Sequence, residues 1–402
     1  MSKSYYSLGL MSGTSMDGVD ASIIHSDGKL KYKAILDKYF EYPKSIYNNL
    51  TTLRDKIKSS KDLKKHQKQI KSIEKEITIF HAKAVNEILK KTKANIDFIG
   101  FHGQTIFHNP DLKISKQLGD GKLLSKLTKK KVVYDFRQND LKNGGEGAPL
   151  TPIFHNLLAK KYKIELPLTF LNIGGISNVT VIKNGRDDDL YARDIGPGNC
   201  MIDDWIRKNK KGNYDKNGSI ARKGKVNKSM LEVFFGNILH AGYGLLARGF
   251  SSSKKILKGR SFVAKTQDRS FDIKTWVNLN PFFKHLSLED GAATITELTA
   301  RYIAEELRIT NVEKLLYPDM TGWQVVLCGG GRKNNFLVDR IKSYNKNKNV
   351  YLIDDCGVDG DFIESQAFAY LAIRSYLGLP ISFPNTTGCK KPCTGGVVVK
   401  NY

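Results

Sequence analysis

Two stretches of the chain share one pattern: an apolar strand, a glycine-rich turn and a second apolar strand. The first covers residues 5–24 with its turn at 12–18, and the second covers 168–182 with its turn at Gly174-Gly175. Glycine permits backbone conformations in which several N–H groups converge on an anion. Each stretch alone is typical of an ordinary β-hairpin. The repetition, with Thr and Ser in the first turn and Ser and Asn after the second, favours two related lobes that bind phosphate groups.

Neither turn fits the two best-known nucleotide-binding motifs. A P-loop continues into Gly-Lys-Ser/Thr, and that sequence follows neither turn. A dinucleotide-binding fingerprint opens a helix, whereas both turns lead into a strand. We therefore expect a nucleotide to be bound within another α/β architecture.

A third glycine cluster, Gly329-Gly330-Gly331, follows the apolar strand 324–328. A helix is expected to start near Asn334, and a strand, a glycine turn and a helix N-terminus together suit a nucleotide. Residues 290–307 show helical spacing, with Asp290 as the expected N-cap. Strands that alternate with helices predict an α/β protein.

The lysine-rich stretch that begins at Arg54 shows an apolar stripe at helical spacing, with the lysines away from the stripe. This pattern predicts a long amphipathic helix with a solvated basic face. No aromatic residue lies between 54 and 79 to stack on a base, which argues against a nucleic-acid surface. A second basic stretch, 207–228, is rich in Gly and Asn and is expected to be a surface loop. The stripe consists of Ile70, Ile73, Ile77, Phe80, Ala84 and Ile88.

The composition modifies this picture only in part. The 65 Lys and Arg outnumber the 40 Asp and Glu of the 402-residue chain, for a formal charge of +25, which by itself invites a nucleic-acid partner. Most of these cations are lysines, whereas nucleic-acid binders favour the bidentate guanidinium of Arg. We therefore attribute the excess mainly to solvated surface, with a modest attraction for anionic substrates.

No apolar run of 18 residues and no signal-peptide pattern occurs, so we expect a cytoplasmic protein that does not span a membrane. Five cysteines, an odd and sparse number, suit a reducing compartment. The only close pair is Cys389 and Cys393, and no His-Cys cluster completes a zinc site around it. We assign no metal or disulfide role to this pair from the sequence.

Several polar residues stand where α/β proteins bind ligands, just past predicted strands. His102-Gly103-Gln104-Thr105 follows strand 96–101, and Arg137 follows strand 132–134. Asp194 is expected after a strand, beside the turn Gly196-Pro197-Gly198, where it could act as a general base. Each also has a structural interpretation: a hydrogen-bonded turn residue, a surface ion pair or a helix cap.

Together these motifs resemble the anhydro-N-acetylmuramic acid kinases over residues 7–398. The most specific match is the opening LGLMSGTSMDGVD at 8–20. The other motifs follow in the family's order: HGQT at 102–105, DFR at 135–137, GAPL at 147–150, NIGGISN at 172–178, Asp194 with GPGN at 196–199, Tyr214-Asp215 with Gly218, GGG at 329–331, SFP at 382–384 and TTG at 386–388.

The resemblance implies an actin-like, hexokinase-type α/β fold with two related lobes around a cleft. We expect an N-terminal lobe of residues 1–135, completed by 373–402, and a second lobe of 136–372 that carries Asp194 and the adenosine loop. The implied reaction uses ATP and water to convert 1,6-anhydro-N-acetylmuramic acid into N-acetylmuramic acid 6-phosphate and ADP in cell-wall recycling. A homodimer, with no nucleic-acid or membrane partner, is also implied.

The resemblance assigns roles to individual residues. Asp194 would activate the water, and Asp17 would hold Mg²⁺ through waters. His102, Arg137 and Glu364 would face the sugar. The ATP-binding residues would be Gly13, Thr14, Ser15, Met16, Asp17, Gly18, Val19, Asp20, Gly174, Gly175, Gly329, Gly330 and Gly331.

Two departures from the family pattern keep other functions open. Glu146 stands where Gln is usual, and Ile195 stands where Thr is more common beside the aspartate. A carboxylate facing the sugar would disfavour an acidic lactyl group, so one alternative is a kinase of a neutral anhydrosugar such as levoglucosan. The other is a non-catalytic, actin-like ATP-binding regulator.

Overall fold

The computed structural model describes residues 3–240, 277–310, 323–346 and 349–399. The chain forms two compact units: unit 1 comprises residues 1–166, 180–192 and 361–402, and unit 2 comprises 167–179 and 193–360. The boundary expected at 135 therefore lies inside unit 1. The reason is that Asp140 is hydrogen-bonded to the C-terminal segment, through Thr387 and Cys393.

The sheet of unit 1 has strand order β12-β6-β4-β1-β2-β3, with β5 paired to β4. Strands β1 to β3 are antiparallel neighbours, whereas β4 runs parallel to β1 and β6 runs parallel to β4. The strands are β1 (Tyr5–Ser12), β2 (Gly18–Ser26), β3 (Tyr32–Glu41), β4 (Phe98–Asn109), β5 (Ile114–Leu118), β6 (Lys131–Tyr134) and β12 (Val397–Val399).

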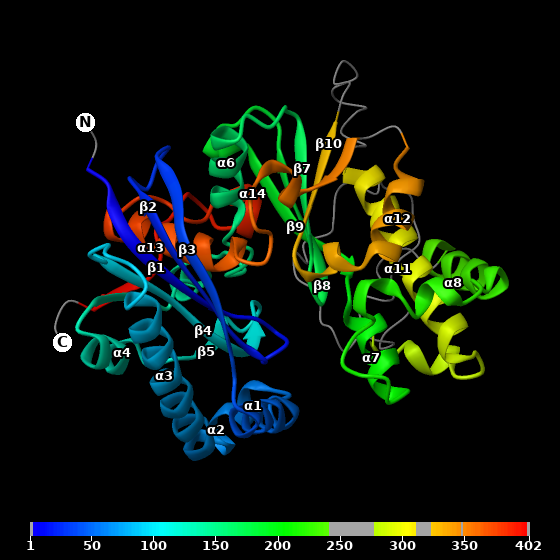
Figure 1. Ribbon diagram of the computed structural model, residues 1–402, viewed down its shortest axis with the longest axis horizontal. Coiled ribbons are helices and arrows are strands. Elements are labelled where there is room, and N and C mark those ends of the chain that lie inside the picture. Colours follow the sequence, from blue (N-terminus) through cyan, green and yellow to red (C-terminus); the bar gives the residue numbers. More distant parts are fainter. Residues whose placement is uncertain (1–2, 241–276, 311–322, 347–348, 400–402) are drawn as a thin grey trace. The chain divides into compact units, whose positions relative to one another are not determined.

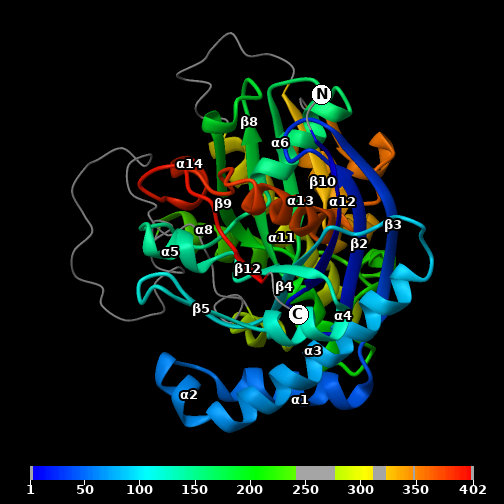
Figure 2. The same ribbon diagram turned by 90° about the vertical axis from the view of Figure 1, so that its left-hand side faces the viewer.

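Helices cover both faces of this sheet (Figures 1 and 2). On one face, α13 (Ile363–Tyr376) packs so closely on β1 that a Cβ on Gly9 would lie 1.8 Å from the Ser365 carbonyl oxygen. On the other face, Leu8 and Leu10 join a buried apolar cluster with α1 (Lys44–Lys56) and α3 (Gln67–Leu89). Because both faces are covered, β1 is buried at every position except Tyr6 rather than at alternate positions.

The apolar stripe predicted in the lysine-rich stretch is confirmed in α3, which buries it against the sheet. The predicted single helix is interrupted, because α1 ends at Lys56 and Ser59 with Asp62 forms a capping box for α2 (Ser60–Lys65). The other helices of unit 1 are α4 (Gly121–Thr128), α5 (Gln138–Lys142), α6 (Pro152–Lys161) and α14 (Pro384–Thr387).

The second sheet has the order β11-β10-β7-β8-β9, and β10 runs parallel to both β7 and β11. In this sheet the central strand β7 has the hairpin β8-β9 on one side and the parallel strands β10 and β11 on the other. The sheet of unit 1 is arranged in the same way around β1, with β2 and β3 on one side and β4 and β6 on the other. The boundary between the two units crosses β8 and β9. The strands are β7 (Leu168–Ile173), β8 (Ile176–Ile182), β9 (Leu190–Pro197), β10 (Gln324–Cys328) and β11 (Asn349–Leu352). The bounds of β7 and β10 are those that the sequence predicts.

Among the described residues of unit 2, the helices are α7 (Cys200–Lys208), α8 (Lys228–His240), α11 (Leu288–Thr310) and α12 (Asn335–Tyr344). Asn334 caps α12 as expected from its position, since its side chain accepts from Leu337 N at 3.0 Å. The prediction of Asp290 as the cap of α11 is wrong: the helix starts two residues earlier, and the Ser287 hydroxyl accepts from Asp290 N. Between α7 and α8, residues 209–227 form loops and short 3₁₀ turns, close to the predicted surface loop.

No helix among the described residues combines the length and apolar character that crossing a membrane requires.

Candidate active site

The first glycine-rich turn, between β1 and β2, is fixed at its base and open at its tip. The Ser12 hydroxyl donates to the Gly18 carbonyl at 2.7 Å and lies 2.7 Å from the Tyr42 hydroxyl, which therefore donates to it. Tyr42 N donates to the Asp17 carbonyl at 2.7 Å. Burial raises the pKa of Tyr42, so the phenol keeps the proton that this chain of bonds needs.

The tip of this turn presents small and polar groups to solvent. Thr14, Ser15 and Asp17 are exposed, and the Ser15 hydroxyl donates to Asp17 Oδ1 at 2.6 Å. Met16, at φ 60°, turns its side chain inward, where it is only 2% exposed. Within unit 1, a Cβ on Gly13 would meet nothing closer than Ser15 Oγ at 3.7 Å. The tip therefore has room for a ligand beside its backbone.

Gln104, which the sequence analysis names only as part of the HGQT motif, is a further candidate site residue. Its Nε2 donates to the Gly13 carbonyl at 2.9 Å, which ties β4 to the turn. Its Oε1 is buried and has no hydrogen-bond partner among the described residues. A buried unpaired acceptor is costly, so this oxygen is a candidate acceptor for a ligand hydroxyl. Its place in the HGQT motif was the available signal.

His102 and Arg137, both predicted to face the sugar, form one network in unit 1, in which His102 is buried and Arg137 is half-buried. His102 Nδ1 lies 2.8 Å from the Gly103 carbonyl, so this nitrogen carries the proton. His102 Nε2 then accepts from Arg137 Nη2 at 2.9 Å, and Arg137 Nη1 donates to the Gly147 carbonyl at 2.8 Å. Burial, assisted by the Arg137 charge, holds the pKa of His102 well below its usual range. The neutral imidazole thus positions the guanidinium.

His102 lies within β4, not after a strand as predicted. The parallel pairing of β4 with β6 ends at Phe101, and the pairing with β1 shifts register before Gln104. Beyond that point β4 continues to Asn109 as the antiparallel partner of β5. The motif therefore does lie at the carboxyl end of the part of β4 that pairs with parallel strands. The strand continues past this point because its last residues pair with β5.

Glu364, the third predicted sugar-binding residue, lies in the first turn of α13. Burial raises the pKa of its carboxyl group, and the Arg137 charge acts against this rise. Glu364 and Arg137 are therefore electrostatic neighbours in unit 1. Glu146 lies on the loop before Gly147, where its N–H donates to the Thr387 carbonyl at 2.8 Å.

The second glycine-rich turn, between β7 and β8, is covered by the chain that follows β9. The Gly174 carbonyl accepts from Asn199 N at 2.8 Å, and the Gly175 carbonyl accepts from Gly198 N at 3.0 Å and Cys200 N at 3.2 Å. A Cβ on Gly198 would lie 2.2 Å from the Gly174 carbonyl oxygen. Close packing against this turn thus requires a glycine at position 198.

The three glycines at 329–331 differ in what they contact. A Cβ on Gly331 would lie 2.2 Å from Ile173 Cγ2, so this glycine packs on the end of β7. Gly330 is exposed, and within unit 2 no atom lies within 4 Å of its Cβ position. Arg332 anchors the turn through a bidentate pair with Asp354, at 2.7 and 3.0 Å. Gly330 is therefore the open position of this loop.

Asp194, the predicted base, lies within β9 rather than after it, because the strand continues to Pro197. The preceding Arg193 forms a 2.7 Å ion pair with Glu306 of α11 and also donates to the Asp194 carbonyl at 3.4 Å. A Cβ on Gly196, at φ 136°, would lie 2.4 Å from a Tyr302 ring carbon. Two contacts with α11 thus fix the backbone on both sides of the half-buried Asp194.

Asp203, on α7, is a titratable residue of unit 2 that sequence analysis missed. Burial raises the pKa of its carboxyl to about 7, with Asp215 adding to the rise and Arg207 opposing it. Carboxyl groups that titrate near neutrality are enriched at functional sites. Only the packing around α7 creates this shift, so the sequence offered no signal for it.

Comparisons with known proteins place these features in a family. The family described as anhydro-N-acetylmuramic acid kinase matches residues 5–401. A protein of that name from Pelagibacter ubique (strain HTCC1062) is 52% identical over 408 residues, which cover 100% of both chains. Proteins of the same name from Agrobacterium fabrum and Brucella canis are 36% and 35% identical, with 98% of each chain covered.

Solved structures give more distant similarities. An activator of 2-hydroxyisocaproyl-CoA dehydratase from Clostridium difficile with bound ADPNP is 13% identical at a TM-score of 0.39, with 92% of this chain and 94% of that chain covered. A ROK family glucokinase from Streptomyces griseus in complex with glucose and AMPPNP is 11% identical at a TM-score of 0.39, with 91% and 99% covered. The expected α/β class is confirmed by the two sheets and the helices between their strands, and the chain divides into two compact units.

Proposed function

The chain belongs to the anhydro-N-acetylmuramic acid kinase family, and we propose that it converts 1,6-anhydro-N-acetylmuramic acid, ATP and water into N-acetylmuramic acid 6-phosphate and ADP. The observation that carries this proposal is the 52% identity with a named relative over the full length of both chains. The three glycine-rich loops, at 12–18, 174–175 and 329–331, and Asp194 occur in the family's order. The reaction would serve the recycling of cell-wall sugars.

The residues around the first turn fit ATP and Mg²⁺. The turn has open backbone at Gly13, exposed hydroxyls at Thr14 and Ser15, and an exposed carboxylate at Asp17. Oxygen ligands and bound waters are what Mg²⁺ prefers, so Asp17 would hold the ion. When bound, Mg²⁺ neutralises charge on the phosphates during phosphoryl transfer. In unit 2, the exposed Gly330 leaves space for the adenosine.

The residues of unit 1 fit a sugar that carries a carboxylate. Arg137 offers a guanidinium whose orientation is fixed by His102 and Gly147, and a planar guanidinium suits a lactyl carboxylate. Gln104 Oε1 is a buried acceptor for a sugar hydroxyl. Glu364, whose pKa burial raises, would contact the sugar beside Arg137.

Asp194 would supply the base. In the 1,6-anhydro ring O6 is bonded to C1 and carries no proton, so the C1–O6 bond must break as O6 takes the γ-phosphoryl group. We assign to Asp194 the removal of a proton from the water that attacks C1. Its negative charge would also stabilise positive charge that develops at C1, as carboxylates do in glycoside hydrolysis. The contacts of Arg193 and Gly196 with α11 would hold it in place.

A direct assay tests this function. The protein is incubated with Mg-ATP and 1,6-anhydro-N-acetylmuramic acid in ¹⁸O-labelled water, and ADP and the sugar phosphate are measured. We expect stoichiometric ADP and sugar phosphate with the label at C1. Faster turnover of levoglucosan would favour the neutral-sugar alternative, and ATP binding without turnover of either sugar would favour the regulator.

The proposal extends to the surroundings of the enzyme. We place it in the cytoplasm, where ATP is available, as a homodimer without nucleic-acid or membrane partners. Sedimentation velocity tests the dimer. A mobility shift with duplex DNA at physiological salt tests the basic surface, and we expect no shift.

A further inference from the structure

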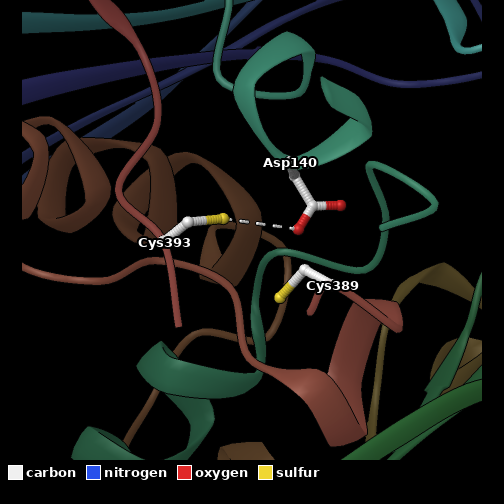
Figure 3. Close-up of side chains that lie close together, drawn as sticks. All are labelled: Asp140, Cys389 and Cys393. Carbon is white, nitrogen blue, oxygen red and sulfur yellow. Dashed lines mark hydrogen bonds between the residues drawn. The ribbon is translucent and has the colours of Figure 1, made fainter. Parts of the chain in front are cut away.

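Asp140, Cys389 and Cys393 form a buried cluster in unit 1 that the proposed reaction does not use (Figure 3). One oxygen of the carboxylate and the two sulfur atoms all lie within 4.8 Å of one another. Asp140 belongs to α5, and both cysteines belong to the C-terminal segment. Cys389 is 1% exposed and Cys393 is 8% exposed, and both are free thiols.

The cluster is connected to the sugar-binding network through Asp140. Its Oδ2 accepts from Gly147 N at 2.7 Å, and the Gly147 carbonyl accepts from Arg137. Its Oδ1 accepts from the Thr387 hydroxyl at 2.7 Å and from Cys393 Sγ at 3.8 Å. Asp140 thus contacts both Cys393 and the loop that holds Arg137.

The pKa of Cys389 is shifted downward, whereas those of Cys393, Cys200 and Cys356 are shifted upward. A hydrogen bond with Cys393 lowers the pKa of Cys389 to about 7, and the same interaction raises the pKa of Cys393. Burial raises the pKa of Cys200 to about 12 and raises that of Cys356 as well. Because the thiolate is the nucleophile, Cys389 is the cysteine of this group that reacts near neutral pH.

We propose that Cys389 and Cys393 are a redox site that a hydroperoxide oxidises to a reversible disulfide. The sulfur atoms must approach from within 4.8 Å to the bonded distance of about 2.05 Å, a small movement of the C-terminal segment. A metal ion is disfavoured, because both oxygens of Asp140 already accept hydrogen bonds and no fourth ligand joins the group among the described residues.

The chemistry balances in two steps. The Cys389 thiolate attacks one oxygen of hydrogen peroxide, which gives a sulfenic acid and, with the proton that the thiol lost, water. The Cys393 sulfur then attacks the Cys389 sulfur, the S–OH bond breaks, and a second water leaves. Asp140 Oδ1, which accepts the Cys393 S–H, is placed to take the thiol proton and pass it to the departing hydroxide, which leaves as this second water. Two thiols are oxidised and one peroxide is reduced.

Oxidation removes the Cys393 S–H that Asp140 accepts and draws the segment around Cys393 toward Cys389. Ser382 moves with it, since Ser382 and Cys393 are paired through backbone hydrogen bonds and their side chains lie 3.1 Å apart. We expect Asp140, Gly147 and then Arg137 to shift. We expect this shift to raise the KM for the anhydrosugar about 10-fold. This consequence rests on the proposed function, because it is measured with that substrate.

Tryptic peptides test the disulfide without any assay of activity. Trypsin cleaves after Lys390, between the two cysteines, so residues 375–390 and 391–400 are separate peptides. After peroxide treatment and non-reducing digestion we expect the two peptides to remain linked, and dithiothreitol to separate them. Unlinked peptides, a sulfinic acid at Cys389 with Cys393 still a thiol, or a bound metal that protects both thiols would overturn the proposal.

Two variants complete the test. Cys393→Ser should lose the linkage and leave a Cys389 sulfenic acid that dimedone traps, whereas Cys356→Ser should keep the linkage. The sugar KM should rise on oxidation in wild type and in Cys356→Ser but not in Cys393→Ser. An unchanged KM in fully linked protein would overturn the connection through Asp140. Absence of turnover in the reduced protein would count against the proposed function alone, since the linkage is measured separately.

Discussion

The two glycine-rich hairpins arise from one sequence pattern but form different structures. The turn after β1 is bonded at its base, through Ser12 and Tyr42, and its tip is exposed. The turn after β7 has both of its glycine carbonyls engaged by the N–H groups of residues 198–200. The tip of the first turn is therefore free to bind a ligand, whereas the second turn also supports the segment after Asp194. That Gly174 and Gly175 of the second turn bind ATP stays a prediction.

Burial favours the neutral form of titratable groups in both units, and in unit 1 it acts on three histidines as well as on Glu364. In unit 1, burial lowers the pKa of His81 and His108 to about 4 and that of His155 to about 3. In unit 2, burial raises the pKa of Asp203 to about 7. Each shift favours the neutral form, so acid should destabilise unit 1 and alkali should destabilise the surroundings of Asp203.

The largest expected effect concerns Asp194, which lies in β9 just before the segment that packs on the second glycine-rich turn. Asp194→Asn keeps the shape of the side chain but removes the base, so we expect kcat to fall about 100- to 10,000-fold with unchanged ATP binding. Initial-rate kinetics and calorimetric ATP titration measure the two quantities. Asp188→Asn, at a carboxylate 74% exposed, is the control and should keep its activity. Near-normal turnover of Asp194→Asn would remove this residue from the mechanism.

Matched alanine substitutions at Gly198 and Gly13 test the two hairpins directly. A Cβ at Gly198 would overlap the Gly174 carbonyl oxygen, so we expect Gly198→Ala to lower the free energy of unfolding by about 2–3 kcal/mol. Gly13→Ala meets only Ser15 Oγ at 3.7 Å and should change it by less than about 0.5 kcal/mol.

Gly13→Ala should instead raise the KM for ATP, because the methyl group occupies the space at the open tip. Urea unfolding and steady-state kinetics separate the two effects. The comparison fails if both variants are equally unstable, or if Gly13→Ala binds ATP as wild type does.

Acid should act on unit 1 through its buried histidines. The pKa of His155 is about 3 in the folded protein and about 6.5 in the unfolded chain. Between these two pH values only the unfolded chain takes up a proton at this residue, so the folded protein loses stability as the pH falls below about 6.5. At pH 5 this residue should account for about 2 kcal/mol of the loss. His155→Gln should reduce the difference in unfolding free energy between pH 7 and pH 5 by that amount. His285→Gln, at an exposed histidine of unit 2, should leave it unchanged.

The smallest effect concerns Asp203, with the opposite sign. Its folded pKa lies above its unfolded value of about 3.9, so the stability present at low pH is lost as the pH rises toward 7. We expect Asp203→Asn to be about 1–2 kcal/mol more stable than wild type at pH 8 and closer to it at pH 5. Asp339→Asn, at an exposed ion pair, should show no such trend. Urea midpoints at both pH values provide the measurement.

The sequence by itself determined those elements that a single pattern of neighbouring residues specifies. β7 and β10 are continuous apolar runs bounded by glycine, and the stripe of α3 repeats at helical spacing, so both kinds of element were predictable. The motifs and their order also gave the family and the candidate residues. Patterns and motifs are properties of residues that are close in sequence, so they can be recognised without knowing how the rest of the chain packs.

Only the tertiary structure decided which residues are brought together from distant parts of the chain. β5 extends β4 beyond His102, and α11 fixes the backbone around Asp194 within β9. The shifted pKa of Asp203 and the cluster of Asp140 with two cysteines some 250 residues later depend on burial. Burial and long-range hydrogen bonds are created by packing. The sequence next to a carboxyl or thiol group does not show which distant residues will pack against that group.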